Sequence, residues 1–427
     1  MYWRFSGAVL ATAEGSCAME FSVIGQLPLL RSDVQVSPFA DRSSSIPKFL
    51  VQAGGSSFVI NGEMRDLIEA LRSQPETLAE LAEEFRARSG KTANVETLRT
   101  VLQTRLSPDL FQNQPKQQFT TPFVVSGQIL SGPLARQITK RLTWLFSWPV
   151  AALSVAAFAV VEYLIFTASF KNVTADSSFL GFLLLYAAVA LGGLIHEMGH
   201  LTACARNGAE HGGVGVGLYL VFPAFYADVT SAWKLSRWPR VSVDLGGLYF
   251  QSMFLTVVGL FAVFTKSMAF YQINFFTLVL MLFTLNPALR FDGYWLLVDL
   301  SGVHNLAARR SAMLGGIFRR KNRGSANAAL DADTKALVAV YTGLVFLFSI
   351  VLVGLTAAAT YRIAVQYPGK VAQAAKAFSA ALANGKGFKS LTSIGALGTD
   401  TFWLVSVVAF LFDLTKRSIH YASNQPS

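Results

Sequence analysis

The sequence contains few cysteines and few charged residues. Cys17 and Cys204 are the only cysteines among its 427 residues, and they lie far apart. Such a pair provides neither the disulfide framework of a small secreted domain nor a thiolate zinc motif. Charged residues make up 14% of the chain and hydrophobic residues 52%, with a mean hydropathy of +0.43. With several apolar runs of about 20 residues or more, this composition excludes a large soluble protein and indicates a helical protein that crosses a membrane repeatedly.

The excess of basic residues has an explanation in the membrane. The net charge is +11 at pH 7, and the Lys and Arg residues cluster beside the apolar runs. This is the pattern of the positive-inside rule, so binding to nucleic acid is a poor explanation of the charge. A short apolar run after Arg4 could be mistaken for a signal peptide, but we expect no cleavage because the N-terminus is predicted to lie in the cytosol.

The apolar runs predict six membrane spans. They lie at about 142–168, 179–204, 241–263, 268–290, 336–361 and 398–415. Placing the basic clusters in the cytosol leaves both termini there. The connection at 363–396 disagrees with this topology, because its four lysines would then lie outside the cell.

The composition also divides the chain along its length. We predict an irregular lead-in, a small soluble domain, a linker, a membrane core of four spans, a basic cytosolic loop, and two further spans with a tail. The predicted boundaries are 1–45, 46–107, 108–141, 142–300, 301–335 and 336–427.

The predicted soluble domain has the pattern of a hairpin followed by three helices. Two short strands flank Gly54 and Gly55. The second helix begins at Thr77, and Glu80 completes a T-x-x-E capping box. This order of elements predicts a winged-helix-like module of the α+β class. Many such modules bind DNA, but this one carries eight basic and eight acidic residues between Ser45 and Ser107. A neutral module lacks the charge needed for phosphates, so we expect it to bind a peptide or protein.

An HExxH motif lies in the second predicted span. His196 and His200 are four residues apart, so on a helix both imidazoles leave the same face and can share one metal ion. Glu197 lies beside them, where it can take a proton from water on that metal. The alternative is two core histidines and a glutamate that reaches the membrane surface. An ionisable group inside a bilayer costs about 2.5–3.5 kcal/mol, which a metal in a polar cavity would offset, so we favour the metal site.

A catalytic zinc site usually has three protein ligands, so a third is required. The candidate carboxylates near the cytosolic side are Asp228, Asp244, Asp292 and Asp299. Asp292 is preferred, because Pro287 and Gly293 can interrupt the helix at the end of the fourth span and direct a carboxylate inward. The second and fourth spans run in the same direction, so their cytosolic ends lie at similar depth.

The residues between the second and third spans do not predict a regular span. Between Asn207 and Asp228 the chain is apolar and rich in glycine. We expect a re-entrant loop or hairpin that lines a cavity. The glycine-rich part, with Gly213 and Gly215 as predicted substrate-binding residues, could supply an edge strand to hold an extended peptide.

These motifs resemble those of the site-2 protease family of intramembrane zinc metalloproteases. In that family the HExxH lies in one span and an N-P-x-x-x-x-D-G sequence ends a later span, with one span between them, and here residues 286–293 read NPALRFDG. The resemblance covers roughly residues 180–300 and implies that His196, His200 and Asp292 bind Zn²⁺. It implies further that Glu197 is the general base and that Asn286 contacts substrate.

Two narrower resemblances suggest a biological setting. The sequence after the HExxH, LYLVFPAFYADVTSAWKLSRWPR, is similar to a bacterial branch of peptide zinc metalloproteases. The predicted module resembles PqqD-like domains, which bind leader peptides of ribosomally made, modified peptides. Together they imply a protease of the bacterial cytoplasmic membrane that acts on a peptide or membrane-protein substrate. Its partners would be lipid and the proteins that modify or export the peptide.

Two other functions remain open from the sequence. The chain could be a non-catalytic component of a peptide export or immunity complex, in which the metal is structural. Glu197 distinguishes this function from a protease, because a structural metal site needs ligands but has no use for a general base. A metal transporter fits less well, since ionisable residues outside the HExxH, chiefly Glu162 and Asp244, lie near span ends.

Overall fold

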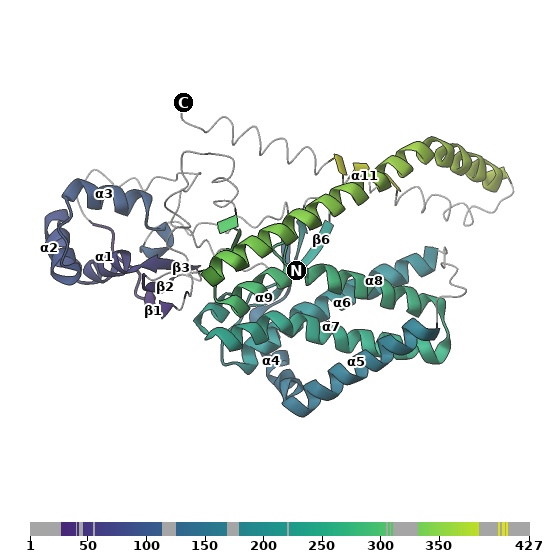
Figure 1. Cartoon of the computed structure of the whole chain (residues 1–427), viewed down its shortest axis with the longest axis horizontal. Helices are drawn as coiled ribbons and strands as arrows, with labels where there is room; N and C mark the ends of the chain where they lie inside the picture. Colours follow the sequence, from purple (N-terminus) through teal and green to yellow (C-terminus); the bar gives the residue numbers. More distant parts are fainter. Residues whose placement is uncertain are drawn as a thin grey trace.

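The structure of the protein is a computed structural model, and most of the chain is helical (Figure 1). The described residues are 27–39, 41, 46–53, 56–112, 125–168, 179–219, 222–304, 306–307, 309–310, 332–383, 400–401, 404–405 and 407–408. Most of the predicted sixth span at 398–415 and most of the predicted basic loop at 301–335 lie outside these residues.

A small antiparallel sheet opens the described chain. Its strands β1 (Gln35–Phe39), β2 (Lys48–Ala53) and β3 (Ser56–Asn61) lie in the order β1-β2-β3. The predicted hairpin corresponds to β2 and β3. The strand β1 was not predicted, because it falls in the segment 1–45 that we expected to be irregular. It is short and contains Pro38, a residue that sheets accept mainly at an edge, where its missing amide hydrogen is not needed.

Three helices follow the sheet, as the sequence predicts. They are α1 (Gly62–Arg72), α2 (Leu78–Ser89) and α3 (Val95–Thr104). The Thr77 hydroxyl caps α2 by accepting a hydrogen bond from the Glu80 amide at 3.2 Å. The Glu80 carboxylate accepts from the amide of Glu76 at 2.8 Å, one residue earlier than a capping box predicts.

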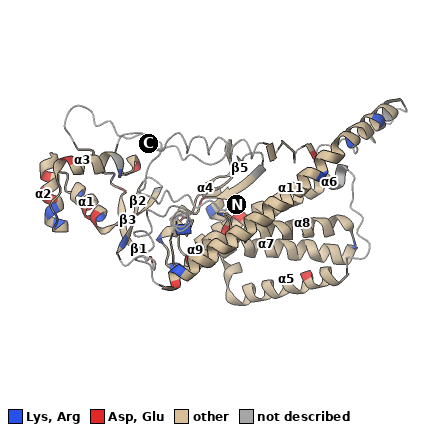
Figure 2. Ribbon diagram, turned by 45° about the horizontal axis from the view of Figure 1, so that its top comes forward, with Lys and Arg blue, Asp and Glu red and all other residues tan. Residues whose placement is uncertain are grey.

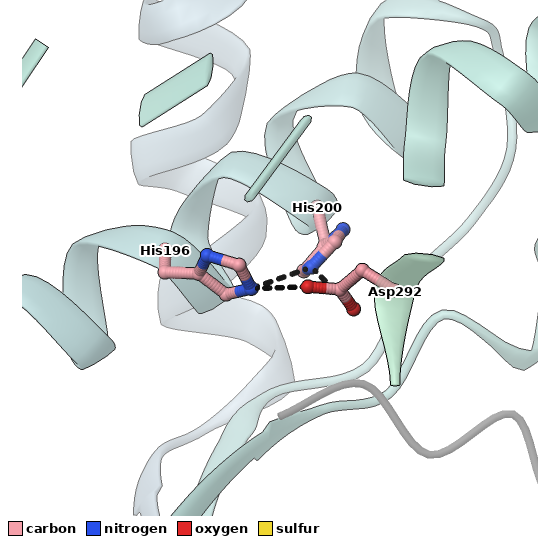
Figure 3. A group of neighbouring side chains, drawn as sticks. All are labelled: His196, His200 and Asp292. Atoms are coloured by element: carbon pink, nitrogen blue, oxygen red, sulfur yellow. Dashed lines mark hydrogen bonds and ion pairs between the residues drawn. The ribbon is translucent and has the colours of Figure 1, made fainter. Parts of the chain in front are cut away.

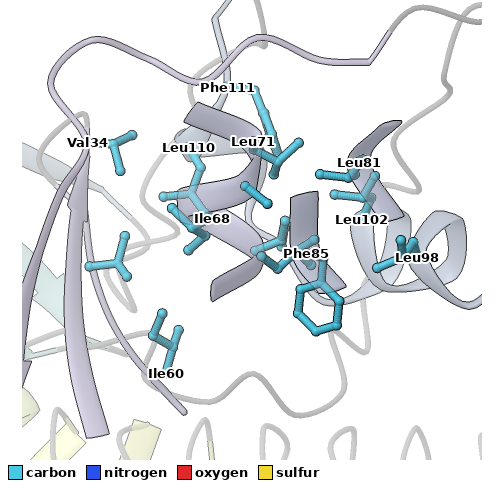
Figure 4. Close-up of a cluster of buried hydrophobic side chains, with 14 of the residues drawn as sticks. Val34, Ile60, Ile68, Leu71, Leu81, Phe85, Leu98, Leu102, Leu110 and Phe111 are labelled. Carbon is cyan, nitrogen blue, oxygen red and sulfur yellow. The ribbon is translucent and has the colours of Figure 1, made fainter. Parts of the chain in front are cut away.

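The helices bury one apolar face against the sheet (Figure 4). Ile68, Leu81 and Leu102 are completely buried at the centre of this cluster. Leu110 and Phe111 join it from the 3₁₀ turn Pro108–Leu110, so the hydrophobic core extends beyond the predicted boundary at 107. We call the unit from β1 to Phe111 the N-terminal module.

The segment predicted as a linker, 108–141, contains regular structure. Strand β4 (Ser126–Leu130) and helix α4 (Gly132–Leu142) lie within or across it. β4 pairs with β5 (Val214–Tyr219), which pairs in turn with β6 (Phe222–Ala227). The prediction was wrong because β4 gains its hydrogen-bonding partner from a strand more than 80 residues away, which local composition does not reveal.

Four helices are long and apolar enough to cross a membrane. They are α5 (Trp148–Ala168), α6 (Phe179–Arg206), α7 (Arg237–Thr265) and α11 (Ala332–Ala383). The helix α8 (Met268–Thr284) is apolar but has only 17 residues. Charged residues are spread over the N-terminal module, whereas α5 and α8 are almost uncharged (Figure 2). The apolar side chains of α5 point outward, with Leu153 72% and Phe166 70% exposed, as expected of a helix facing lipid.

Two predicted span boundaries differ from the structure. The fourth span was predicted to reach residue 290, but α8 ends at Thr284 and a separate helix, α9 (Asp292–Ser301), follows. The predicted connection at 363–396 is helical as far as Ala383, because α11 continues through Pro368. The described residues therefore contain four candidate spans, while the predicted count of six is not tested by them.

Close packing of α6 on α7 brings the HExxH motif against a second helix. A Cβ placed on Gly199 of α6 would lie 2.1 Å from the carbonyl oxygen of Gly246 on α7. In the opposite direction, a Cβ on Gly246 would lie 2.7 Å from the carbonyl oxygen of Gly199. Small residues at such a crossing let two membrane helices approach backbone to backbone. The two helices lie side by side at the centre of the bundle (Figure 1).

Candidate metal centre

Two helices bring three predicted ligands together. His196 and His200 project from the same face of α6, one turn apart, and Asp292 faces them from the first turn of α9 (Figure 3). The His196 Nε2 atom lies 2.9 Å from Asp292 Oδ2, and His200 Nε2 lies 3.5 Å from Asp292 Oδ1. The two Nε2 atoms are 3.1 Å apart. All three side chains are at least 95% buried.

The spacing of these atoms fits a tetrahedral zinc ion. Zinc binds histidine nitrogen and carboxylate oxygen at about 2.0–2.2 Å, so two ligand atoms at tetrahedral angles lie roughly 3.3–3.5 Å apart. The three observed separations, from 2.9 to 3.5 Å, lie close to that value. These two histidines and one carboxylate, all buried, form a group among the described residues that could hold a metal ion.

The break between α8 and α9 directs Asp292 toward the histidines. The side chain of Asn286 accepts a hydrogen bond from the Ala288 amide at 2.8 Å, which stabilises the turn after α8. Gly293 then lies so close to the end of α8 that a Cβ there would be 1.8 Å from the carbonyl oxygen of Leu285. The predicted interruption by Pro287 and Gly293 is therefore present, and Asp292 begins a new helix within it.

The other candidate carboxylates and histidines have different surroundings. Asp299 forms a buried ion pair with Arg240 at 2.9 Å. Asp228 accepts hydrogen bonds from the amide and hydroxyl of Thr230. His211 bonds to Thr139, and His304 packs edge-on against Phe39. Within the described part of the chain, none of these residues joins the group formed by His196, His200 and Asp292.

Glu197 follows a residue of the candidate metal-binding group without belonging to that group. It follows His196 on α6 and is completely buried. Because successive helical residues point about 100° apart, its carboxylate leaves α6 on a different face from the two imidazoles. A general base must lie within about 2.6–3.2 Å of the proton that it takes, directly or through one water.

The glycine-rich hairpin lies next to the same stretch of α6. The Phe225 ring of β6 packs on Gly193, where a Cβ would lie 3.0 Å from it. Gly193 is three residues before His196, so β6 lies close to the candidate metal centre. The glycine-rich part was expected to supply an edge strand, but it forms β5, the central strand of its sheet, which is paired on both sides. The strand at the edge on this side of the sheet is β6.

The two glycines predicted to bind substrate are covered by their own sheet. A Cβ on Gly213 would lie 2.1 Å from the carbonyl oxygen of Leu130 in β4. A Cβ on Gly215 would lie 2.3 Å from the ring of Tyr226 in β6. Their small size therefore serves the close packing of the hairpin, and any role toward substrate would act through its backbone.

Three further residues of the centre lie on α7 and were not predicted. The His196 Nδ1 atom lies 3.0 Å from Gln251 Oε1, and the His200 Nδ1 atom lies 2.7 Å from the Val243 carbonyl oxygen. Gly247 lies between these two contacts along the helix and faces both Nε2 atoms. A polar Gln251 one turn after Gly247 in an apolar helix is a pattern that could have indicated them.

Part of the chain has a curated relative. It is the "Putative peptide zinc metalloprotease protein YydH" of Bacillus subtilis (strain 168), which is 32% identical over 107 residues. The matched region is 25% of this chain and 42% of the relative, so the similarity is distant and partial. No family model matches the chain, and no solved structure matches it. The relative is named as a zinc metalloprotease, and this chain has a buried group of two histidines and one aspartate that could hold a metal ion.

Proposed function

We propose that this protein is an intramembrane zinc metalloprotease with a site-2-protease-like core. The observation that carries the proposal is the convergence of His196, His200 and Asp292 at separations that suit one tetrahedral ion. The location of the HExxH in a long apolar helix and the partial similarity to a named peptide zinc metalloprotease support it.

Each residue of the centre then has a role. His196, His200 and Asp292 would hold Zn²⁺ and leave a fourth position open for water or substrate. Zinc bound there would supply a Lewis acid that polarises the scissile carbonyl and lowers the pKa of its water. Glu197 would take a proton from the attacking water and deliver it to the leaving amine. Burial of these groups excludes bulk water, which strengthens their electrostatic effect on the reaction.

The substrate would be an extended peptide held beside the hairpin. A peptide must be extended to expose its backbone, and β6 is an edge strand that can bind one by strand addition. Phe225 of β6 packs against α6 one turn before His196, so a peptide on this edge would pass near the metal ligands. We retain Gly213, Gly215 and Asn286 as proposed substrate-binding residues. The two glycines would act indirectly, by letting β5 pack closely behind β6, and Asn286 would act from the turn after α8.

The N-terminal module is better suited to bind a peptide or protein than a nucleic acid. We propose that it is a winged-helix-like, cytosolic peptide-binding domain and that the substrate is a ribosomally made peptide that is matured or exported. Its balanced charge argues against nucleic acid. The proposed topology has six spans in a bacterial cytoplasmic membrane with both termini in the cytosol, which the basic clusters support.

The test is zinc content measured by mass spectrometry on detergent-purified protein, beside cleavage of a mixture of unstructured peptides. We expect about one zinc per chain in the wild type, lost in His196→Ala and Asp292→Ala. Asp333→Ala removes an exposed carboxylate at the start of α11 and serves as the matched control that keeps zinc. Glu197→Gln should keep zinc and lose cleavage by roughly 10²-fold or more.

Two results would contradict the proposal. A wild-type protein that binds no zinc when the ion is supplied would remove the metal site. Full cleavage by Glu197→Gln would remove the assigned general base. Zinc without cleavage in the wild type would instead favour the alternative, a non-catalytic membrane component of a peptide export or immunity complex with a structural metal.

A further inference from the structure

One face of α7 forms the wall opposite the two histidines. Val243, Gly247 and Gln251 are spaced four residues apart, so they lie on the same side of the helix over two turns. Each of them contacts or faces an imidazole of α6. Val243 and Gln251 supply hydrogen-bond acceptors, and Gly247, which has no side chain, leaves room beside the imidazoles.

The two acceptors fix the protonation of both rings. A carbonyl or amide oxygen can only accept, so the Nδ1 atoms of His196 and His200 must carry the protons that they donate to Gln251 and Val243. Both Nε2 atoms are then left with their lone pairs directed at the space between α6 and α9. That is the tautomer in which a neutral histidine binds a metal through Nε2.

The orientation of Gln251 is itself determined by a neighbour. Its Nε2 atom donates to the carbonyl oxygen of Thr277 on α8 at 3.5 Å, and its side chain is 94% buried. With the amide nitrogen directed at α8, the amide oxygen is the atom that faces His196. Gln251 therefore connects α8 to the imidazole.

Gly247 keeps open the space into which the lone pairs point. A Cβ at this position would lie 2.4 Å from His200 Nε2 and 2.6 Å from His196 Nε2. These distances are far below van der Waals contact, and they concern the two atoms that would bind the ion. Any side chain at position 247 would compete with the ion for its place.

We propose that α7 is the positioning element of the metal centre, with Gln251 as the residue that sets the affinity for the ion. The inference rests on the proposed zinc site. His200 is held by a backbone carbonyl, which no side-chain change removes, whereas His196 depends on a side chain. Residues that orient metal-bound histidines in this way typically change metal affinity by about 10–100-fold when replaced. Gly247 contributes the volume that the ion occupies.

The test is the zinc dissociation constant of the detergent-purified full chain, measured by competition with a chelator. Gln251→Leu removes the acceptor at similar volume, and we expect zinc to bind about 10–100-fold more weakly. Gln251→Glu keeps an oxygen facing Nδ1, so it should bind zinc as tightly as the wild type or more tightly. Gly247→Ala should lose zinc binding. Ser252→Ala is the matched control, because this buried hydroxyl bonds only to the Tyr249 carbonyl of its own helix among the bonds observed.

The thermal stability of the zinc-free proteins separates positioning from packing. Gln251→Leu and Ser252→Ala should unfold at similar temperatures without zinc and differ only when zinc is present. Equal zinc affinity in Gln251→Leu and the wild type would overturn the inference and leave the proposed function intact. Equal loss in Gln251→Leu and Gln251→Glu would also overturn it, since the acceptor would then have no effect. A wild type that binds no zinc would overturn the proposed function together with the inference.

Discussion

The Arg240 Nε atom lies 2.9 Å from Asp299 Oδ1, and both side chains are almost completely buried. Arg240 belongs to α7, and Asp299 lies on α9 two turns after Asp292, on the same face of that helix. Arg237, also on α7, donates to the carbonyl oxygen of Asp299 at 3.0 Å. The helix that contacts both histidines therefore also holds the helix that carries the aspartate, so α7 fixes the relative position of the predicted ligands.

Removal of one partner of this ion pair should be costly. Asp299→Ala leaves the Arg240 guanidinium buried without its carboxylate, which in comparable sites costs about 3–5 kcal/mol. We expect a lower unfolding temperature in detergent and weaker zinc binding, because α9 keeps the backbone bond from Arg237 but loses its ion pair with α7. The double variant Arg240→Met with Asp299→Leu has no buried charge and should recover most of the stability. A double variant no more stable than Asp299→Ala would contradict this account.

The crossing of α6 and α7 at glycine predicts a second sensitive position. Gly199→Ala would place a Cβ 2.1 Å from the Gly246 carbonyl oxygen, so the helices must separate. We expect a loss of about 1–3 kcal/mol and weaker zinc binding, because both histidines move away from α7. Gly343→Ala in α11 is the matched control, since a Cβ there meets nothing within 4 Å. That change should be neutral or stabilising by roughly 0.5–1 kcal/mol. Equal behaviour of the two variants would argue against the close crossing.

The predicted ligands could be found from sequence because their geometry is local. A spacing of four residues places His196 and His200 on one face of any helix. Pro287 and Gly293 indicate a break that frees Asp292, and α9 does begin there. The contacts of α7 could not be found in the same way. Which residue of α7 meets His196 depends on the rotation and register of two helices, and Gln251 lies 55 residues further along the chain.

The same distinction between local and distant contacts explains the fold. The helices α1, α2 and α3 follow from periodic apolar residues and the Thr77 cap. The strands β1 and β4 were missed because each is short, and β4 is stabilised by a partner remote in sequence. The fourth span was placed too long because hydropathy continues past Thr284, whereas the turn at Asn286 ends the helix.

A buried histidine outside the membrane helices should make stability depend on pH. His211 donates from Nδ1 to the Gly212 carbonyl oxygen at 2.9 Å, and its Nε2 atom lies 2.8 Å from the Thr139 hydroxyl oxygen. Burial lowers the pKa of His211 below its ordinary value of about 6.5, and the charge of Arg136 acts in the same direction. The unfolded chain therefore takes up this proton at a higher pH than the folded chain.

Stability should consequently fall as the pH drops below about 6.5 and stop falling below the folded pKa of His211. The measurement is the unfolding temperature of detergent-purified protein between pH 8 and pH 5, compared with His211→Gln. Subtraction of the two curves removes the contribution of other groups. A wild type that loses no more stability than His211→Gln on acidification would refute the assignment.

Phe39 of β1 connects the N-terminal module to the helices of the candidate metal centre. Its ring lies 4.3 Å from the His304 ring, centroid to centroid, and 6.0 Å from that of Trp233. The Arg240 guanidinium lies over the same ring at 5.7 Å. Phe39 is 7% exposed and clusters with Leu50 of the module and with Trp233, so residues from both sides of this contact enclose its side chain. Because Arg240 also holds Asp299, motion of β1 can reach α9 through this contact.

Phe39→Ala should therefore loosen two separate elements at once. Loss of a buried aromatic ring costs about 3–5 kcal/mol, and here the loss falls on the contact between module and core. We expect faster amide hydrogen exchange in β1 and in α9, with α1 and α3 unchanged. Phe58→Ala is the matched control, because Phe58 of β3 packs against the hydrophobic core of the module, so this change should leave α9 protected. If Phe39→Ala leaves exchange in α9 unchanged, the module is not coupled to the helix that carries Asp292.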